Sequence, residues 1–326
     1  MVTVPAVIAV EVLVLVSAPL LLTAAAVVGA GTGSARPLRS TALVVAYAAI
    51  ELTTLARLLM GVEDVDALLG TVLDRAYRAM RIILQVGVLV EQGSATRAQL
   101  ATSDGLVVLA RHCGPGDSLF IAWLLVVQYR LRLRVVLTSL LRWEPVVDLA
   151  SDRLPLCFVG RRRGRTRRAI TDIAAAMSPG DALLLFPEGG NFNWQRWNRA
   201  ISRLTATGAY RLARRARRRT HTLPPHVGGA LAAVTGSPEA DVLLLAHSGF
   251  AADGRDRPWW QLPDHRTLNV RTTLAPAATV PRDAEALQAW LDTAWSDIDT
   301  WVAHHATPER DTAAIGASNG TSNDCA

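Results

Sequence analysis

His112 and Asp117, a histidine and an aspartate with four residues between them, are the pair in this sequence best suited to acid–base chemistry. The apolar run before them, Gly105 to Ala110, is typical of a short buried strand, and Leu119 to Tyr129 is typical of a helix. The Gly114-Pro115-Gly116 turn between the two runs favours a sharp bend. We therefore expect Asp117 to fold back onto the imidazole ring of His112.

A carboxylate bonded to one imidazole nitrogen fixes the tautomer of the ring. The other nitrogen can then act as a base near neutral pH, which supplies two of the three parts of a serine-type triad. The attacking hydroxyl would come from a substrate. The alternative interpretation is a loop histidine, with Asp117 as the N-cap of the following helix. Cys113 also offers a nucleophile, but its position suits any small residue in a tight turn.

Three further segments place polar or glycine-rich residues after apolar runs. A short run from Leu156 to Val159 is followed by Gly160 and then Arg161, and Asp181 to Leu185 leads into Phe186-Pro187-Glu188-Gly189. A stiff turn follows later, at Leu223-Pro224-Pro225. Sites in open α/β sheets collect at the carboxyl ends of strands, so these segments are candidates for one shared site.

The order of these four segments resembles the glycerolipid acyltransferase family that includes the 1-acylglycerol-3-phosphate acyltransferases. The H-x-x-x-x-D motif of that family matches His112 and Asp117, and its apolar stretch ending in arginine matches Phe158 to Arg161. Its F-P-E-G motif matches Phe186 to Gly189, and its proline-containing turn matches Leu223-Pro224-Pro225. The resemblance covers about residues 80 to 250. Arg111 stands where the family often has asparagine.

The resemblance implies a membrane-associated O-acyltransferase of phospholipid biosynthesis. It would move a fatty acyl group from acyl-CoA or acyl carrier protein to a lysophospholipid hydroxyl, most simply converting 1-acylglycerol-3-phosphate to phosphatidic acid. No cofactor is implied beyond the thioester co-substrate. His112 would be the base, Asp117 its orienting carboxylate, and backbone N–H groups near Gly114 to Ser118 would stabilise the oxyanion. The implied substrate-binding residues are Arg161, Phe186, Pro187, Glu188, Gly189 and Arg196, with Glu188 bonding a glycerol hydroxyl.

Other functions stay open at this point. The acceptor could instead be a lysocardiolipin or a glycolipid, or water could replace it in a hydrolase. The sequence contains no G-x-S-x-G motif between a predicted strand and a predicted helix, which argues against a serine esterase. A non-catalytic membrane-binding protein that keeps the fold is a further alternative, although the presence of His112, Asp117 and Glu188 together argues against it.

Two apolar runs open the chain. Val4 to Ala30 is interrupted only by Glu11 among charged residues and is long enough to span a bilayer. Thr41 to Met60 contains two charged residues, and such charges are costly at mid-bilayer. We expect residues 1–62 to form membrane-associated helices at the cell membrane, with the catalytic domain facing the cytoplasm, where acyl-CoA is found. Two buried helices of a soluble domain are the alternative.

The sequence after the two apolar runs predicts an α/β fold, in which a mostly parallel sheet is flanked by helices. We assign residues 63–306 to an acyltransferase domain and residues 307–326 to a disordered tail. The predicted strands are Gly105 to Ala110, Leu133 to Thr138, Leu156 to Val159, Ala182 to Phe186, Val242 to His247 and Leu268 to Leu274, with a possible start of the sheet at Ile82 to Val90. The predicted helices are Ser118 to Arg130, Thr166 to Met177, Trp197 to Arg219 and Asp283 to His304.

The composition limits the partners. Half of the 326 residues are hydrophobic, and the net charge of +6 comes from arginine alone, because the chain has no lysine. Three scattered cysteines exclude a disulfide framework and argue against a zinc site, so we expect no metal. Arginines cluster at Arg161 to Arg168 and at Arg211 to Arg219, where they would contact either anionic lipid or solvent. The clusters lack interleaved aromatic residues, so we expect no nucleic-acid partner. The sequence does not determine the oligomeric state.

Overall fold

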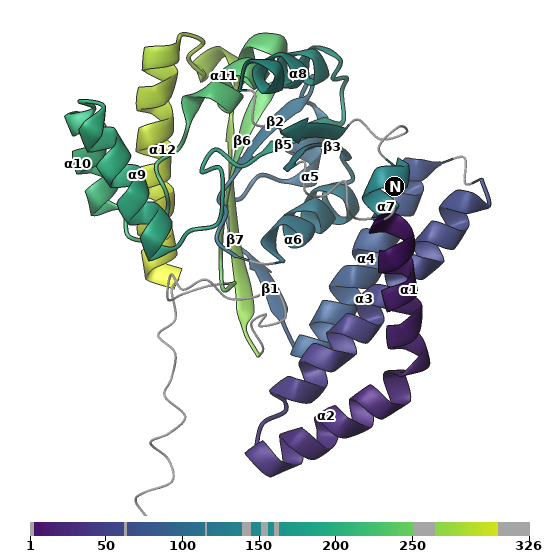
Figure 1. Ribbon diagram of the computed structural model, residues 1–326. Coiled ribbons are helices and arrows are strands. Elements are labelled where there is room, and N and C mark those ends of the chain that lie inside the picture. Colours follow the sequence, from purple (N-terminus) through teal and green to yellow (C-terminus); the bar gives the residue numbers. More distant parts are fainter. Residues whose placement is uncertain are drawn as a thin grey trace, which may run out of the picture.

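A seven-stranded sheet lies at the centre of the molecule (Figure 1). The computed structural model describes residues 3–61, 64–114, 116–138, 145–150, 156–159, 163–250 and 265–305. The predicted tail, 307–326, lies outside these residues. The strands are β1 (Gly87–Val90), β2 (Leu106–Ala110), β3 (Arg132–Thr138), β4 (Leu156–Val159), β5 (Asp181–Leu185), β6 (Asp241–Ser248) and β7 (Thr267–Ala275), in the spatial order β1-β7-β6-β2-β5-β3-β4.

The sheet is mostly parallel, as the sequence predicts. Strands β6, β2, β5, β3 and β4 all run in one direction, whereas β7 is antiparallel to β6 and carries β1 parallel to itself. The carboxyl ends of the five parallel strands therefore share one edge of the sheet. The segments that follow β2 and β5 leave from this edge, and they contain His112 and Glu188. Topology thus brings together residues that are far apart in sequence.

Helices cover both faces of the sheet. Alternate residues of β2 pack into two different cores, because successive side chains of a strand point to opposite faces. One face is covered by α4 (Val65–Leu84), α6 (Asp117–Trp123) and the π turn η1 (Leu124–Gln128). The other is covered by α8 (Arg163–Ala175), α11 (Val227–Gly236) and α12 (Ala284–His305). Two short helices, α5 (Arg97–Ala101) and α7 (Pro145–Ala150), complete the connections.

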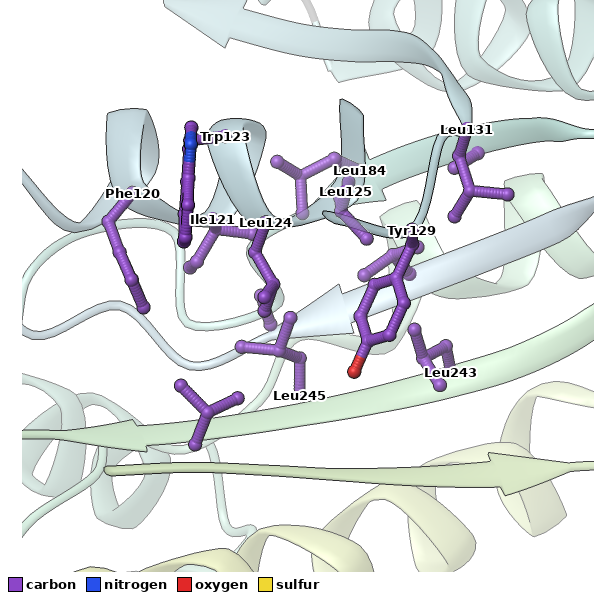
Figure 2. Close-up of a cluster of buried hydrophobic side chains, with 14 of the residues drawn as sticks. Phe120, Ile121, Trp123, Leu124, Leu125, Tyr129, Leu131, Leu184, Leu243 and Leu245 are labelled. Carbon is purple, nitrogen blue, oxygen red and sulfur yellow. The ribbon is translucent and has the colours of Figure 1, made fainter. Parts of the chain in front are cut away.

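The core on the α6 face holds the helix that follows His112 in the chain. Figure 2 shows Ile121 and Leu124 packed toward Leu184 and Leu245 of the sheet, and all four side chains are buried. Burying a side chain of this size contributes about 1.5–3 kcal/mol. The first turn of α6, which begins at Asp117, therefore has a rigid support.

Three elements of the structure differ from the prediction. The single helix from Trp197 to Arg219 is wrong, because the chain forms α9 (Trp194–Ala206) and α10 (Tyr210–Arg218), with Gly208 between them at φ 75°. Only glycine adopts this conformation without strain. The predicted start of the sheet at Ile82 to Val90 is confirmed for Gly87–Val90, which form β1, whereas α4 continues to Leu84. Helix α11 was not predicted; its sequence, VGGALAAVTG, has little amphipathic pattern.

The N-terminal segment forms three helices, α1 (Thr3–Val16), α2 (Ala18–Thr32) and α3 (Arg36–Leu59). The first apolar run bends by 66° between α1 and α2, near Pro19, which has no N–H to donate. By length and composition, α3 could cross a membrane, and the bent α1–α2 pair could form a second span. Glu11 and Glu51 are buried, while the outward faces carry exposed apolar side chains, including Val10, Leu13, Val16, Leu20 and Val27.

Candidate active site

The predicted contact between His112 and Asp117 is present at the carboxyl end of β2. The Nδ1 atom of His112 lies 2.9 Å from Oδ2 and 3.0 Å from Oδ1 of Asp117. Gly116, at φ 87°, turns the chain back so that Asp117, the first residue of α6, reaches the ring. A side chain with a Cβ rarely adopts this backbone conformation, which explains a glycine at this position.

Asp117 is held as an ionised carboxylate. Its Oδ2 accepts hydrogen bonds from the N–H groups of Cys113 (2.7 Å) and Gly114 (3.2 Å), and its Oδ1 accepts one from the Ser118 hydroxyl. Burial raises the pKa of Asp117, but the hydrogen bond and charge of His112, with other nearby groups, outweigh it and bring the pKa below its usual value. The Gly114 N–H was expected to stabilise an oxyanion; that expectation is wrong, because this N–H is already bonded to Asp117.

The geometry leaves the second nitrogen of His112 available. An ionised carboxylate only accepts hydrogen bonds, so Nδ1 of His112 carries the proton and Nε2 has a free lone pair. No described residue forms a hydrogen bond with Nε2, and the side chain of His112 is 21% exposed. The ring packs on Phe186, with 4.4 Å between centroids. His112 can therefore take a proton from a hydroxyl that approaches from solvent.

Glu188 lies behind His112. It is buried, and both of its oxygens already accept hydrogen bonds: Oε1 from the His112 N–H (3.3 Å) and the Trp295 indole (3.2 Å), and Oε2 from the Leu223 N–H (2.9 Å). Burial raises the pKa of Glu188 to about 7, against the opposing effects of Arg111 and these N–H donors. The geometry supports a role in holding the His112 loop, in place of the expected contact with a glycerol hydroxyl.

Helix α12 supports the site through three buried side chains that the sequence did not identify. Trp295 bonds Glu188, and Asp299 accepts hydrogen bonds from the N–H groups of Thr220 and His221 and from the Thr222 hydroxyl. Asp292 forms an ion pair with Arg219 (2.8 Å). This helix therefore fixes the segment that leads to Leu223. The only signal in the sequence for this role was the presence of aspartates among the apolar positions of one helix face.

Replacing Trp295 with phenylalanine should destabilise the protein more at pH 8 than at pH 5. Since the pKa of Glu188 is raised to about 7, this carboxyl is protonated in the folded state at pH 5 and ionised at pH 8. The folded state loses stability as pH rises from the pKa that Glu188 has in the unfolded chain toward 7, because the buried carboxyl becomes ionised. The hydrogen bond from the indole N–H limits that loss. A hydrogen bond to a charged group contributes about 1.5–3 kcal/mol.

Thermal unfolding in detergent at the two pH values measures this difference. Trp290→Phe is the matched control, because Trp290 lies on the same helix and packs on the same core. We expect its effect on stability to be equal at both pH values. Equal destabilisation by Trp295→Phe at pH 5 and pH 8 would show that the indole does not act through the Glu188 charge.

Arg111 and His247 join the ends of β2 and β6 by a reciprocal contact. The Arg111 guanidinium donates to the His247 carbonyl (2.8 Å), and Nε2 of His247 donates to the Arg111 carbonyl (2.9 Å). Arg111 also donates twice to the His221 carbonyl, at 2.8 and 3.2 Å. Burial lowers the pKa of His247 to about 4, so its ring is neutral at neutral pH. This contact explains an arginine immediately before the motif histidine.

Three potential metal ligands, Cys113, Asp117 and His247, have ligand atoms within 4.8 Å of one another. Their hydrogen bonds fit a polar network better than a metal site. Nδ1 of His247 faces the Cys113 sulfur (3.7 Å), whereas its Nε2 faces the Arg111 carbonyl and lies 3.8 Å from Asp117. To bind a metal ion together with Cys113 and Asp117, one ring nitrogen of His247 would have to direct its lone pair at a point between those two ligands. Cys113 is also buried, which does not suit a nucleophile.

The other predicted site residues differ in how close they lie to His112 and Glu188. Arg161 lies outside the described residues. Pro187 and Gly189 continue the loop after β5. The Pro187 carbonyl accepts a hydrogen bond from the His226 N–H. Arg196 is exposed at the start of α9, and its guanidinium donates to the Asn191 carbonyl (3.1 Å). It also covers Gly190, where an added Cβ would lie 2.7 Å from Nη1. Arg196 therefore borders the loop that holds Glu188.

Two comparisons with known proteins found a match. The Acyltransferase family model matches residues 93–228, which include all of the motif residues described above. The structure is similar to the 1-acyl-sn-glycerophosphate (LPA) acyltransferase PlsC from Thermotoga maritima, with a TM-score of 0.56 and 15% sequence identity over 84% of this chain and 98% of that chain. No curated protein matches the sequence significantly.

The two similarities have different weight. At 15% identity, the structural match establishes the fold, and the family model independently identifies the segment that contains His112, Asp117 and Glu188. The family resemblance predicted from the four motifs is confirmed. Residues 93–228 therefore form an acyltransferase domain, in a chain whose fold is similar to that of a glycerolipid acyltransferase.

Proposed function

We propose that this protein transfers a fatty acyl group from a thioester to the free hydroxyl of 1-acylglycerol-3-phosphate, forming phosphatidic acid. The observation that carries the proposal is the His112–Asp117 pair, with Nε2 of His112 open to solvent in an acyltransferase-family domain. The name of the similar Thermotoga maritima enzyme supports the same acceptor. The donor would be acyl-CoA or acyl carrier protein.

The reaction needs one base and no acyl-enzyme. Nε2 of His112 takes the proton of the acceptor hydroxyl as the hydroxyl oxygen attacks the thioester carbonyl. The imidazolium that forms is stabilised by Asp117, whose negative charge is fixed by the N–H groups of Cys113 and Gly114. When the carbon–sulfur bond breaks, the imidazolium returns this proton to the thiolate. The products are an ester and a free thiol, and His112 is again neutral.

Arginines from two segments are the candidates for binding the acceptor phosphate. The family resemblance assigns this role to Arg161, which follows β4, with Arg162, Arg163 and Arg165 as alternatives in the same segment. Arg196 is the second candidate, because it lies exposed beside the loop after β5. A guanidinium can bind a phosphate through two parallel hydrogen bonds. The aromatic ring of Phe186, packed on His112, would form a wall of the same acceptor site.

The acceptor and product are lipids, so the enzyme would work at the cell membrane. The exposed apolar faces of α1 and α2 and the length of α3 support association with a bilayer. Burial of Glu11 and Glu51 removes two charges from these outward faces. We place the catalytic domain on the cytoplasmic side, where acyl thioesters are made.

A panel of acceptors tests the proposal. Purified full-length protein in detergent is given acyl-CoA with 1-acylglycerol-3-phosphate, lysocardiolipin, lysophosphatidylcholine or monoacylglycerol, and the products are identified by mass spectrometry. We expect phosphatidic acid and free CoA in equal amounts, with little transfer to monoacylglycerol, which has no phosphate. Preferred transfer to monoacylglycerol, or release of free fatty acid without transfer, would contradict the proposal.

A further inference from the structure

Helices α9 and α10 form a hairpin that carries two parallel stripes of arginine. Gly208 makes the turn, and the Ala209 N–H closes it on the Leu204 carbonyl (2.9 Å). Each helix has arginines at positions i, i+3 and i+7, which lie on one helix face. These residues are Arg196, Arg199 and Arg203 on α9 and Arg211, Arg214 and Arg218 on α10, and all six are exposed.

The positive charge of this surface is not neutralised locally. No aspartate or glutamate occurs between Gly189 and Pro238, a stretch that contains nine arginines. Among the described residues, only Arg215 and Arg219 of this stretch form ion pairs, both with the buried Asp292 of α12. These two contacts attach the inner side of α10 to the protein. The two exposed stripes form no ion pair with any residue that the structure describes.

Large aromatic side chains stand at the start of both helices. Trp194, the first residue of α9, is 42% exposed, and Tyr210, the first residue of α10, is 68% exposed. Tryptophan and tyrosine combine an apolar ring with a polar group and are enriched at the boundary between water and lipid. Tyr210 lies beside the arginine stripe of α10, and arginine joined with such a residue is typical of binding at an anionic membrane surface. A helix face that contacts only solvent has no need of exposed aromatic residues.

The hairpin is separate from the N-terminal helices. In Figure 1, α9 and α10 lie beside α12, on the opposite side of the sheet from α1, α2 and α3. It is nevertheless continuous with the active site, because α9 follows the loop of Glu188 and Arg196 covers Gly190 in that loop. A lipid surface bound here would therefore lie next to the loop that carries Glu188.

We propose that the α9–α10 hairpin is a second membrane-binding surface, which binds the phosphate headgroups of anionic lipids through its arginine stripes. The guanidinium fork suits phosphate, and Trp194 and Tyr210 would lie at the level of the headgroups. The N-terminal helices supply apolar contact that does not depend on lipid charge, whereas the hairpin makes binding depend on it. This inference does not depend on which acceptor the enzyme uses.

Vesicle binding by the full-length protein tests the inference without an activity assay. Detergent-free protein is mixed with vesicles of phosphatidylcholine alone, or of phosphatidylcholine with about one third phosphatidylglycerol, and the bound fraction is measured by flotation. The test variant is Arg199→Gln, Arg203→Gln and Arg214→Gln together. The control, Arg97→Gln, Arg130→Gln and Arg282→Gln, removes the same charge from exposed arginines outside the hairpin and outside the Arg161–Arg168 cluster.

We expect wild-type protein and the control to bind the anionic vesicles more tightly than the neutral ones. The hairpin variant should bind anionic vesicles about a hundredfold more weakly than wild type, since each arginine near an anionic surface contributes roughly a fivefold effect. All three proteins should bind neutral vesicles equally, through the N-terminal helices. High salt should remove the preference of wild type for anionic lipid.

Two results would overturn the inference. One is equal binding of the hairpin variant and the control to anionic vesicles. The other is normal vesicle binding by the hairpin variant together with a selective loss of transfer from acyl carrier protein, compared with acyl-CoA. The second result would assign the arginine stripes to the acidic carrier protein instead of the membrane.

Discussion

Replacing His112 with alanine should lower the turnover number by about a hundred- to ten-thousandfold and leave the protein folded. Nε2 of His112 is the basic nitrogen that the structure leaves open to solvent, and its partner nitrogen is fixed by Asp117. Without the ring, the acceptor hydroxyl must lose its proton to water. The remaining partners of Asp117, the N–H groups of Cys113 and Gly114, still hold the loop.

Release of free CoA, measured with excess acceptor and donor, gives the turnover number of this variant. Circular dichroism and thermal unfolding show whether the fold is retained. His304→Ala is a suitable control, because His304 is exposed near the end of α12 and away from the acyltransferase motifs. A folded His112→Ala protein with more than a tenth of wild-type turnover would exclude His112 as the base.

The sequence predicted the parts of the fold that depend on local patterns. The strands at Leu106–Ala110, Leu156–Val159 and Asp181–Leu185 are short apolar runs with clear ends, and their boundaries agree with the prediction within one residue. The His112–Asp117 contact was also predictable, because a glycine-rich turn between a strand and a helix can close in few ways. Both depend on residues that are close together in the chain.

The sequence did not predict the supports of the site that come from distant segments. Trp295 is 107 residues from the Glu188 carboxylate that it binds, and His247 is 136 residues from Arg111. A buried tryptophan or histidine has no local pattern that distinguishes a structural hydrogen bond from ordinary packing. The direction of the Glu188 side chain could not be predicted for the same reason. Its three N–H donors lie on three separate segments of the chain.

Replacing Asp117 with asparagine should lower the turnover number nearly as much as loss of His112, by about a hundred- to ten-thousandfold. The reason is that asparagine would favour the wrong tautomer of the His112 ring. The amide oxygen would take the Oδ2 position, where it still accepts from the N–H groups of Cys113 and Gly114. The amide nitrogen would then lie at Oδ1, 3.0 Å from Nδ1 of His112, and would donate to it. The proton of the ring would move to Nε2, which could no longer act as a base.

Stability should change in a way that depends on pH. Because the folded state lowers the pKa of Asp117, its ionised form stabilises the protein above the unfolded pKa, and this contribution is lost as pH falls through the folded pKa. The difference in stability between wild type and Asp117→Asn should therefore shrink in acid. Asp181 offers a matched control, because it is also buried with a lowered pKa, but it starts β5 at the opposite edge of the sheet, bonded to Arg132 and Arg134.

Asp181→Asn should reproduce the pH-dependent loss of stability and leave turnover unchanged below its unfolding temperature. The pair of variants separates the two effects of a buried carboxylate, because only Asp117 contacts the imidazole. Turnover and thermal unfolding are measured for both proteins across the same pH series. Equal losses of turnover in the two variants would mean that the effect of Asp117 is one of stability, and the role of this carboxylate in orienting His112 would have to be abandoned.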